Sequence, residues 1–454
     1  MNNFSYNLPD LKSCNIAIIG LGYVGLPLAY EFSKLQREDK AYLFEIIGFD
    51  INKKRILELE SGIDTTKEIN QVELTQLKNI KFTSNAIDLE KADVFIVTVP
   101  TPLTARNQPD FLALLSASKT VGRALRKRKE RKKNSIPVVI YESTVYPGAT
   151  EEVCLPVIIE ESGMNLFKKG NSDCFALGYS PERINPGDKK HKLSDIKKVT
   201  SGACKESAVW INELYKTVIK AGTFQAKSIK IAEASKVIEN VQRDLNIAIV
   251  NEFSLILSKL DIDTLDVLEA AETKWNFLPF KPGLVGGHCI GVDPYYLTYK
   301  SKQMGYYPDL ILSGRNINNG MGVWIIEKII LEMVSRSLDF KKARILFLGV
   351  TFKENCPDIR NSQIINMISA IKKYGINVDV IDPQVDINNF ERENKIKIVN
   401  NLFYDCKYDV VIVGVAHKEF KDINLEQWKF LIKEKGFFFD IKGIVPRSLN
   451  PIRL

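Results

Sequence analysis

The stretch CNIAIIGLGYVG, Cys14 to Gly25, decides the fold, because a short apolar run leads directly into three glycines at the spacing GxGxxG. The apolar run Cys14–Ile19 predicts a buried strand, and the amphipathic pattern that follows predicts a helix. Gly20 allows the tight turn, Gly22 lets the backbone approach a pyrophosphate, and Gly25 lets the helix pack on the strand. The helix N-terminus adds N–H groups and a positive dipole, so this stretch predicts a dinucleotide site. A purely structural glycine turn is the alternative.

Strands and helices continue to alternate through the first third of the chain. An apolar strand over 43–50 ends at Asp50, and the pattern then predicts a helix, a strand, a helix, a strand and a helix, over 51–62, 92–102, 111–125, 137–145 and 149–163. This alternation is typical of a parallel, doubly wound sheet. Asp50 is placed to accept hydrogen bonds from an adenosine ribose, and its charge would repel a 2′-phosphate. The sequence therefore favours NAD over NADP.

The pattern changes in the middle of the chain and returns near its end. Residues 228–260 keep a 3.6-residue period without Gly or Pro, which predicts one long helix, and the helical pattern continues over 263–272. From about Lys341 the chain again alternates, with strands predicted over 343–352, 377–382, 408–417 and 436–443 and a helix over 362–375. The first turn of this last unit lacks GxGxxG, so we expect no second dinucleotide there.

These patterns together give the expected architecture. The fold class is α/β, with an N-terminal Rossmann-type parallel sheet, a central all-helical domain containing one long helix, and a smaller C-terminal Rossmann-like α/β domain. We expect boundaries at 1–226, 227–335 and 336–454.

Composition adds further bounds. The 454 residues are 45% hydrophobic and 26% charged, which is ordinary for a globular protein. No stretch approaches the ~18 uninterrupted apolar residues of a membrane span and no leader pattern opens the chain, so we expect a cytoplasmic protein without membrane insertion. The seven cysteines are odd in number and form no CxxC pair. We therefore expect reduced thiols and no metal site.

The formal charge of +8 is compatible with a nucleic acid or with a small anionic substrate. Much of the excess lies in GRALRKRKERKKNS, residues 122–135. This run fits a solvated helix end, where cations suit the helix C-terminus. An anionic surface partner is the alternative, and a nucleic-acid-binding or NAD-sensing protein would use the basic run 123–133.

Cys289 differs from the other cysteines because it lies in a glycine-rich loop, GLVGGHCIGVDPYY (283–296), beside His288. Near a dinucleotide fold, a thiolate can trap an aldehyde as a thiohemiacetal, which is the adduct that offers a second hydride. The resulting thioester is then released by water as an acid. A buried cysteine in a tight turn is the alternative.

Further candidates lie on the long helix and on loops after strands. Lys236 and Asn240 are four residues apart and share one helix face, where a lysine could hold a water or a developing alkoxide. Glu182, in YSPERINPG, becomes a candidate base if its loop folds over the crevice. Thr101 in VPTP and Thr144 in ESTV should border that crevice, because ligands bind outside the carboxyl ends of the strands. Each could instead be an ordinary surface or turn residue.

Together, the motifs resemble those of the nucleotide-sugar 6-dehydrogenases, the UDP-glucose/GDP-mannose dehydrogenase family, from Ile16 to about Pro446. They are GLGYVGLPLA, VPTP, ESTVYPG, SPERINPG, EASKVIENVQRDLNIA, GGHCIGVDPYYL and GVTFKENCPDIRNS, in the family's order. The resemblance implies an NAD domain, a helical dimerisation domain built on the long helix, and a UDP-binding domain. It also implies NAD as the cofactor, a UDP-sugar substrate, and a homodimer or larger homo-oligomer.

The resemblance implies catalytic roles for individual residues. Cys289 would be the nucleophile, Lys236 and Asn240 would stabilise the oxyanion and position the catalytic water, and Asp293 would belong to that water network. Glu182 would assist thioester hydrolysis, with Thr144 beside it.

The same resemblance implies contacts with cofactor and substrate. Lys353, Arg360 and Lys442 would face the UDP diphosphate or the sugar. The expected NAD contacts are Gly20, Gly22, Tyr23, Val24, Gly25, Asp50, Arg55, Pro100, Thr101 and Thr144. The expected substrate contacts are Glu182, Arg183, Lys236, Asn240, Gly287, His288, Lys353, Arg360 and Lys442.

One departure from the family pattern bears on the substrate. This chain has His288 where UDP-glucose dehydrogenases usually have serine, and Ile290 where they have phenylalanine. The stretch 274–297 is instead similar to a bacterial branch that acts on UDP-N-acetylhexosamines and supplies uronic acids for capsule, Vi-type polysaccharide and O-antigen.

We therefore expect NAD-dependent four-electron oxidation of the C6 hydroxyl of UDP-GlcNAc or UDP-GalNAc to the uronic acid. UDP-glucose is the alternative substrate. A two-electron hydroxyacid-type dehydrogenase is a second enzyme class, and a nucleic-acid-binding or NAD-sensing protein is the non-enzyme alternative.

Overall fold

The computed structural model describes residues 8–39, 42, 44–77, 79–131, 135–168, 173–184, 192–287, 289–399 and 407–454. The chain divides into two compact units. The first runs up to Glu239 and includes Tyr295–Gly305, and the second comprises Asn240–Pro294 and Tyr306–Leu454. The expected three-domain division stays a prediction. Among the described residues, no helix combines the length and apolar character that crossing a bilayer requires.

The first unit is built on a sheet whose strands are β1 (Asn15–Ile19), β2 (Glu45–Phe49), β3 (Ile80–Thr83), β4 (Val94–Val97), β5 (Val138–Tyr141), β6 (Asn165–Leu166), β7 (Cys174–Tyr179), β8 (Lys198–Gly202) and β9 (Thr223–Gln225). Within the described ranges their order is β3-β2-β1-β4-β5-β7-β8-β9, with β6 paired to β7 outside this path. The pairing is parallel except between β7 and β8. This confirms the expected parallel, doubly wound N-terminal sheet.

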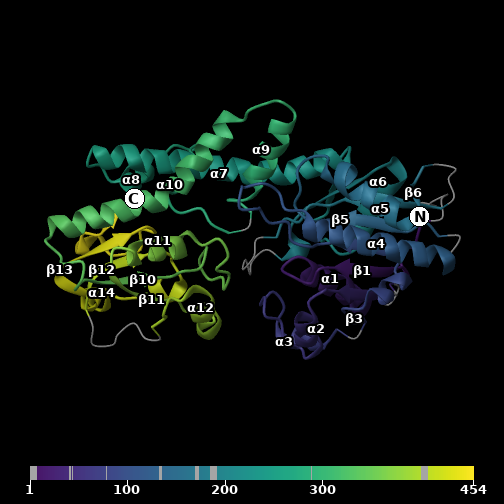
Figure 1. The fold of residues 1–454 in the computed structure, drawn as a ribbon, viewed down its shortest axis with the longest axis horizontal. Coiled ribbons are helices and arrows are strands. Elements are labelled where there is room, and N and C mark those ends of the chain that lie inside the picture. The colour runs from purple at the N-terminus through teal and green to yellow at the C-terminus, as the bar shows by residue number, and fades with distance from the viewer. Residues whose placement is uncertain are drawn as a thin grey trace. The chain divides into compact units, whose positions relative to one another are not determined.

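Helices cover both faces of this sheet (Figure 1). They are α1 (Gly25–Glu38), α2 (Lys53–Glu60), α3 (Gln71–Thr75), α4 (Leu112–Arg131), α5 (Leu155–Ser162), which follows a π-helical turn (Thr150–Cys154), and α6 (Lys205–Lys216). On one face, Phe32 of α1 and Trp210 of α6 belong to the same buried cluster as Ile16 of β1. On the other, the hydroxyls of Tyr141 (β5) and Ser118 (α4) lie 2.6 Å apart. Strands buried on both faces explain the continuous apolar runs in the sequence.

The second unit contains a smaller parallel sheet, of order β11-β10-β12-β13-β14 among the described residues. Its strands are β10 (Arg344–Leu348), β11 (Asn377–Ile381), β12 (Tyr408–Val413), β13 (Ile432–Asp440) and β14 (Ile452–Arg453). Its helices are α8 (Thr264–Glu272), α10 (Asp309–Ser335), α11 (Gln363–Lys372), α12 (Ile387–Asn394), α13 (Lys418–Lys421) and α14 (Leu425–Leu431). Phe347 of β10 faces α10 and α11, and its neighbour Leu346 faces α13 and α14. The expected second α/β sheet is confirmed.

The long helix expected over 228–260 is α7 (Ile229–Lys259), and a shorter helix, α9 (Asp293–Gln303), follows the loop of Cys289. At 3.6 residues per turn, five polar residues of α7 fall in one strip, and each is at most 5% exposed: Glu233, Lys236, Asn240, Asp244 and Asn251. The opposite strip is apolar and exposed, with Ile238, Ile249, Phe253 and Ile256. The buried polar strip supplies the functional residues described below.

Candidate functional site

The glycine turn after β1 has a conformation that only glycine accommodates. Gly20 has φ +96°, and a Cβ on Gly25 would lie 1.9 Å from the carbonyl oxygen of Gly20. The Thr98 hydroxyl donates to the same carbonyl at 2.7 Å, which fixes the turn against the end of β4. A Cβ on Gly22 would meet no atom of the described residues within 4 Å. That open side fits the approach of a pyrophosphate, as the GxGxxG spacing predicts.

Asp50 and Arg55 both hold the peptide groups of this turn. The Asp50 carboxylate accepts the N–H of Leu21 at 2.9 Å and that of Asn52 at 2.8 Å. The buried Arg55 donates from Nε to the Leu21 carbonyl at 2.9 Å and pairs with Asp64 at 2.7 Å. A carboxylate oxygen has further lone pairs, so Asp50 retains the capacity to accept ribose hydroxyls. Arg55 acts here by fixing the turn, and its expected NAD contact stays a prediction.

The loops VPTP and ESTV lie together in the first unit. The Thr101 hydroxyl donates to the Thr144 carbonyl at 2.7 Å, and the Ser143 hydroxyl donates to the Val99 carbonyl at 2.6 Å. Tyr296, from the motif GGHCIGVDPYYL, donates its hydroxyl to the Thr101 carbonyl at 2.6 Å. Three motifs that are far apart in the sequence therefore meet around Thr101.

Glu182 lies beyond the end of β7 in a buried, charged environment. Its Oε2 is 3.6 Å from Nζ of Lys236, which is itself buried, and its Oε1 accepts the N–H of Ile184. Burial raises the pKa of Glu182, the cations Lys236 and Lys198 oppose that rise, and Glu142 adds to it. The structure thus brings together Glu182 and Lys236, two of the residues expected to take part in catalysis. Both belong to the first unit.

A buried ion pair beside Glu182 was not predicted from the sequence. Lys198, at the start of β8, lies 2.7 Å from Glu142, and the Tyr215 hydroxyl of α6 donates to the same carboxylate. Both charged side chains are almost fully buried. Glu142 belongs to the ESTV motif, but no sequence signal marks Lys198, because a lysine at a strand end is ordinarily solvated.

Arg183, an expected substrate contact, is engaged within the first unit. Its guanidinium pairs with Glu239 at 2.7 Å and donates to the Lys197 carbonyl at 2.8 Å. Its role toward the substrate stays a prediction.

Glu233 is a buried carboxylate at the start of the polar strip of α7. It accepts the backbone N–H groups of Gly148 and Thr150, which open the turn before α5, so it ties α7 to the segment that follows the ESTV loop. Burial is the largest cause that raises its pKa, to about 7, and the N–H donors oppose the rise. No local pattern distinguishes Glu233 from Glu239, the other glutamate in EASKVIEN.

Glu233→Gln should change how stability depends on pH. The folded state holds the Glu233 proton up to about pH 7, whereas the unfolded chain loses it near 4.5, the ordinary pKa of a glutamate. Stability from this group is therefore complete below pH 4.5 and is lost as pH rises to about 7. At 1.36 kcal/mol per pKa unit, the wild-type protein should lose about 3 kcal/mol relative to the variant over this window.

Urea unfolding of both proteins across pH 4–8 measures this difference. Glu152→Gln is the control, because ion pairs with Lys300 and Lys230 lower the pKa of that carboxyl and predict the opposite sign. Parallel wild-type and Glu233→Gln curves would contradict the prediction.

The loop of Cys289 belongs to the second unit. Cys289 is half-buried, and its carbonyl accepts the N–H groups of Val292 and Asp293 at 3.1 and 2.8 Å, which turns the chain into α9. The buried Asp293 carboxylate accepts a 2.5 Å hydrogen bond from the side-chain amide of Asn240 on α7. The structure therefore brings together the asparagine and the aspartate that the resemblance assigned to one water network. His288 lies outside the described residues.

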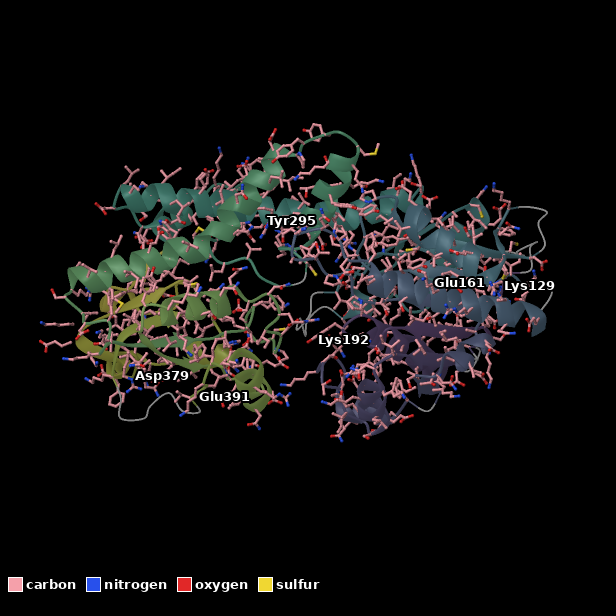
Figure 2. The ribbon with its side chains drawn as sticks, in the orientation of Figure 1. Lys129, Glu161, Lys192, Tyr295, Asp379 and Glu391 are labelled. Carbon is pink, nitrogen blue, oxygen red and sulfur yellow. The ribbon has the colours of Figure 1, made fainter. Side chains whose placement is uncertain are left out.

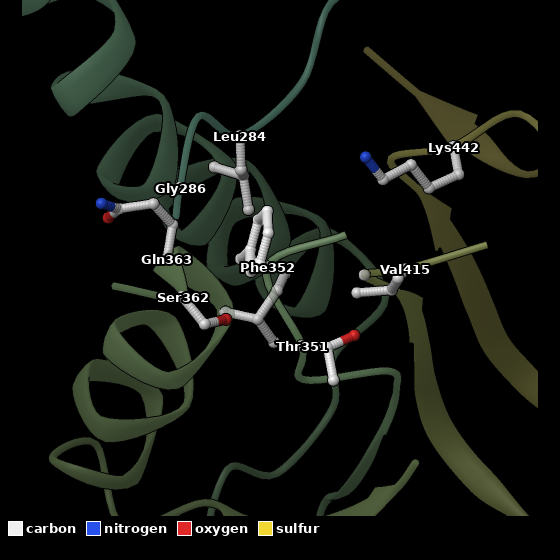
Figure 3. A pocket seen from close by; sticks show the side chains of 10 residues that line it. Leu284, Gly286, Thr351, Phe352, Ser362, Gln363, Val415 and Lys442 are labelled. Carbon is white, nitrogen blue, oxygen red and sulfur yellow. The ribbon is translucent and has the colours of Figure 1, made fainter. Parts of the chain in front are cut away.

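A pocket in the second unit lies beside this loop. It is lined by Leu284, Gly286, Thr351, Phe352, Ser362, Gln363, Ile364, Gly414, Val415 and Lys442. Figure 3 shows the Lys442 ammonium directed toward the pocket from one side and Ser362 and Phe352 on the other. The buried Ser362 hydroxyl has no hydrogen-bond partner among the described residues, so a ligand could supply one. Of these residues, Lys442 was predicted from the sequence as a substrate contact, and Phe352 and Ser362 were not.

The other expected contacts in this unit are placed differently. Gly287 has φ +82°, and a Cβ there would lie 2.8 Å from the Phe352 ring, so this glycine allows close packing. The Nζ of Lys353 lies 5.6 Å from the centre of the Phe352 ring. Arg360 forms a two-pronged pair with Asp358, at 2.9 and 2.6 Å. Neither Lys353 nor Arg360 lines the pocket, and their contacts with substrate stay predictions.

Several cations in the described part of the basic run pair with acidic groups. Arg123 pairs with Glu161 at 3.0 Å and Lys129 with Asp173 at 3.1 Å. Figure 2 labels Lys129, near the end of α4, and Glu161, near the end of α5. Arg128 is 1% exposed and pairs with Asp93 at 2.7 Å, so the expectation of a solvated helix end is wrong for this residue. Residues 132–134 lie outside the described residues.

The cysteines are free thiols at every described position, Cys14, Cys154, Cys174, Cys204, Cys289 and Cys356. Cys406 lies outside the described residues. Among the residues with described structure, no group of three or more His, Cys, Asp or Glu side chains is arranged to hold a metal ion.

The sequence matches three consecutive domains of one family. Residues 14–219 match the NAD binding domain of the UDP-glucose/GDP-mannose dehydrogenase family, 230–320 match its central domain, and 346–447 match its UDP binding domain. The chain belongs to the UDP-glucose/GDP-mannose dehydrogenase family. Members of this family are NAD-dependent nucleotide-sugar dehydrogenases, which confirms the expected cofactor and enzyme class.

Relatives within the family match over almost the whole chain. The UDP-N-acetyl-D-glucosamine 6-dehydrogenase of Salmonella typhi is 50% identical, over 98% of this chain and 99% of that protein. The protein of the same name from Pseudomonas aeruginosa is 48% identical, over 98% and 100%. The solved structure of a UDP-D-ManNAc dehydrogenase from Pyrococcus horikoshii is 28% identical, covers 97% of this chain and 98% of its own, and has a TM-score of 0.82.

Proposed function

We propose that this protein oxidises the C6 hydroxyl of UDP-N-acetyl-D-glucosamine to the uronic acid, with NAD as the oxidant. The observation that carries the proposal is the Cys289 loop, which combines a half-exposed thiol with the buried Asn240–Asp293 hydrogen bond four residues further on. The choice of sugar is supported by the two relatives of that name, which match over the full length at 50% and 48% identity.

The proposed reaction removes four electrons in two oxidations. NAD, when bound, accepts a hydride in each of them. The first oxidation converts the C6 alcohol to an aldehyde with loss of a proton, and the Cys289 thiolate then adds to the aldehyde carbon through a new C–S bond. Oxidation of this thiohemiacetal gives a thioester. Water attacks the thioester, the C–S bond breaks, and the uronate leaves as the thiol regains its proton.

The surroundings of each residue support its proposed role. The buried Lys236 ammonium would stabilise the oxyanions that form at C6, because a cation acts most strongly where water is excluded. The Asn240 amide and the Asp293 carboxylate would hold the attacking water. Glu182 would act as the general base for hydrolysis, and its raised pKa brings it closer to the working range of such a base.

Asp50→Ala should weaken NAD binding and leave binding of the UDP-sugar unchanged. A hydrogen bond to a charged group contributes about 1.5–3 kcal/mol, so the Kd for NAD should rise roughly tenfold to a hundredfold. The variant should also discriminate less against NADP, because a negative charge that repels the 2′-phosphate is gone. Titration of both ligands tests this prediction, and equal weakening of NAD and UDP-sugar would contradict it.

The exposed apolar strip of α7 supports self-association. Ile238, Ile249, Phe253 and Ile256 are each at least 42% exposed along one face of this helix. We propose a homodimer or larger homo-oligomer that covers this strip, which the molar mass in solution would test. The domains 1–226, 227–335 and 336–454 would then bind NAD, associate and bind the UDP-sugar. A cytoplasmic location and supply of uronate to a surface polysaccharide are parts of the same proposal.

The decisive test is the NADH yield from limiting UDP-GlcNAc, UDP-GalNAc and UDP-glucose, each offered separately. Two NADH per UDP-GlcNAc, with little turnover of the other two, is the expected result. Two NADH from another sugar would identify that sugar as the substrate instead. One NADH per sugar would indicate a two-electron oxidation. No NADH from any of the three would overturn the proposal.

A further inference from the structure

We propose that a buried polar network on α7 and α10 is a latch that positions the Cys289 thiol for the second oxidation. The latch consists of Asn251, Asp244, Asn318 and Arg315, each at most 3% exposed. The inference rests on the proposed function, because it assigns these residues a part in the covalent step of that reaction.

The first part of the latch is Asn251, which hydrogen-bonds to Gly283 at the start of the Cys289 loop. Asn251 accepts the N–H of Gly283 at Oδ1, at 2.7 Å, and donates from Nδ2 to the carbonyl of the same glycine at 3.0 Å. One side-chain amide therefore satisfies both backbone groups of Gly283, and all of these atoms are buried. This pairing fixes both the position and the orientation of the peptide groups at Gly283.

The second part continues the network to the far side of the loop. Asn251 also donates to Oδ1 of Asn318 at 2.8 Å, and Asn318 donates to the Asp244 carboxylate at 2.8 Å. Arg315 pairs with the same carboxylate at 2.6 Å. A Cβ on Gly291 would lie 3.9 Å from Nη2 of Arg315, so the guanidinium lies near the chain two residues after Cys289. The latch thus hydrogen-bonds to the loop before the thiol and lies near the loop after it.

The composition of the loop explains why it needs such support. Glycines occupy positions 283, 286, 287 and 291 of the segment, and glycine loses more conformational freedom on ordering than any other residue. The described part of the segment before α9 contains no helix or strand. Apart from the latch, Asn361 donates to the Gly287 carbonyl at 3.2 Å and Asn240 holds Asp293. Hydrogen bonds from side chains therefore hold this segment in place of regular secondary structure.

The two oxidations should respond differently when the latch is loosened. The first oxidation forms an aldehyde and does not need the thiol, whereas the second proceeds through the C–S bond to Cys289. Misplacing a reacting group by about 1 Å can cost about 10²-fold in rate. A shifted thiol should therefore slow the second oxidation and leave the aldehyde free to escape.

Asn251→Leu tests this inference, because leucine has a similar size and cannot hold Gly283. The variant and the wild-type enzyme would receive limiting UDP-GlcNAc, excess NAD and semicarbazide to trap free aldehyde. We expect the wild-type enzyme to give two NADH per sugar. The variant should approach one NADH and one trapped aldehyde, with the second oxidation about 10²-fold slower and the KM for UDP-GlcNAc within a small factor of the wild-type value.

Ser254→Ala is the matched control. Ser254 is also fully buried on α7, but its hydroxyl donates within the helix, to the Asn251 carbonyl at 2.7 Å. Loss of stability alone would reduce the active fraction in either variant and leave the yield at two NADH per sugar. If Asn251→Leu does not fold, Asn251→Asp keeps the acceptor for the Gly283 N–H and loses the donor to its carbonyl, and it should also shift the yield toward one.

The outcomes separate the latch from the proposed function. Two NADH per sugar from a folded Asn251 variant, with no trapped aldehyde, would overturn the latch while the wild-type result upholds the four-electron reaction. A wild-type yield other than two would instead refute the function on which the latch rests.

Discussion

Cys289→Ala is expected to end uronate formation, with a loss of roughly 10⁴-fold or more, because removal of a catalytic nucleophile in other enzymes costs rates of this order or larger. Without the thiol there is no thiohemiacetal, so the second hydride has no donor. NADH formation should stop at one per sugar, and the aldehyde should accumulate. The Kd for NAD should stay within about twofold, since the glycine turn of β1 belongs to the other compact unit.

The measurement combines NADH yield, mass spectrometry of the sugar product and NAD titration. Cys204→Ser is the matched control, because Cys204 is the other described thiol of intermediate exposure and serine also serves as the N-cap of α6. Uronate made by Cys289→Ala at the wild-type rate would refute covalent catalysis by this thiol.

Glu182→Gln is expected to stop the reaction at the thioester. A general base contributes about 10²–10⁴-fold, so release of the uronate should slow by a factor in that range. Both oxidations should still occur once per active site. The variant should therefore show a rapid burst of two NADH, followed by slow turnover, and intact-protein mass spectrometry should find the sugar attached to Cys289.

The pH dependence of turnover by the wild-type enzyme is a second test of Glu182 as the general base. Burial raises the pKa of Glu182, and only the ionised carboxylate can accept a proton. Turnover limited by hydrolysis should therefore rise as pH increases through this raised pKa, and Glu182→Gln should lose that rise. Glu239→Gln is the control, because Glu239 pairs with Arg183 in the same unit and is about one-third exposed. A free thiol in Glu182→Gln at steady state would contradict the prediction.

Local sequence patterns predicted much of the fold and the centre of the site. The spacing of Gly20, Gly22 and Gly25 predicted the turn after β1, since the backbone geometry there excludes any side chain at two of the three positions. Periods of apolar residues predicted both sheets and the long helix. The unusual place of Cys289 in a glycine-rich loop, together with the resemblance, predicted the candidate nucleophile. Apart from the resemblance, each of these signals lies within one continuous stretch of the chain.

The period of α7 predicted a helix but not its orientation. Its apolar residues Ile238, Ile249 and Phe253 are exposed, whereas Glu233 and Asp244 are fully buried. A helical period of apolar residues predicts that they face the core, because burying them stabilises a monomer. A helix that associates with another copy of the chain would reverse this assignment, because its apolar side would be covered by the partner.

The sequence by itself determined where strands, helices and the glycine turn occur and which thiol is exceptional, because steric limits and apolar periods act over short stretches of chain. Tertiary structure alone decided the partners of the buried charges. Lys198 pairs with Glu142, which is 56 residues away in the sequence. Glu233 accepts the N–H of Thr150 across 83 residues, and Arg315 pairs with Asp244 across 71 residues. No local pattern encodes such pairs. They form only where the packing of several elements removes water from both groups, so that each must find the other.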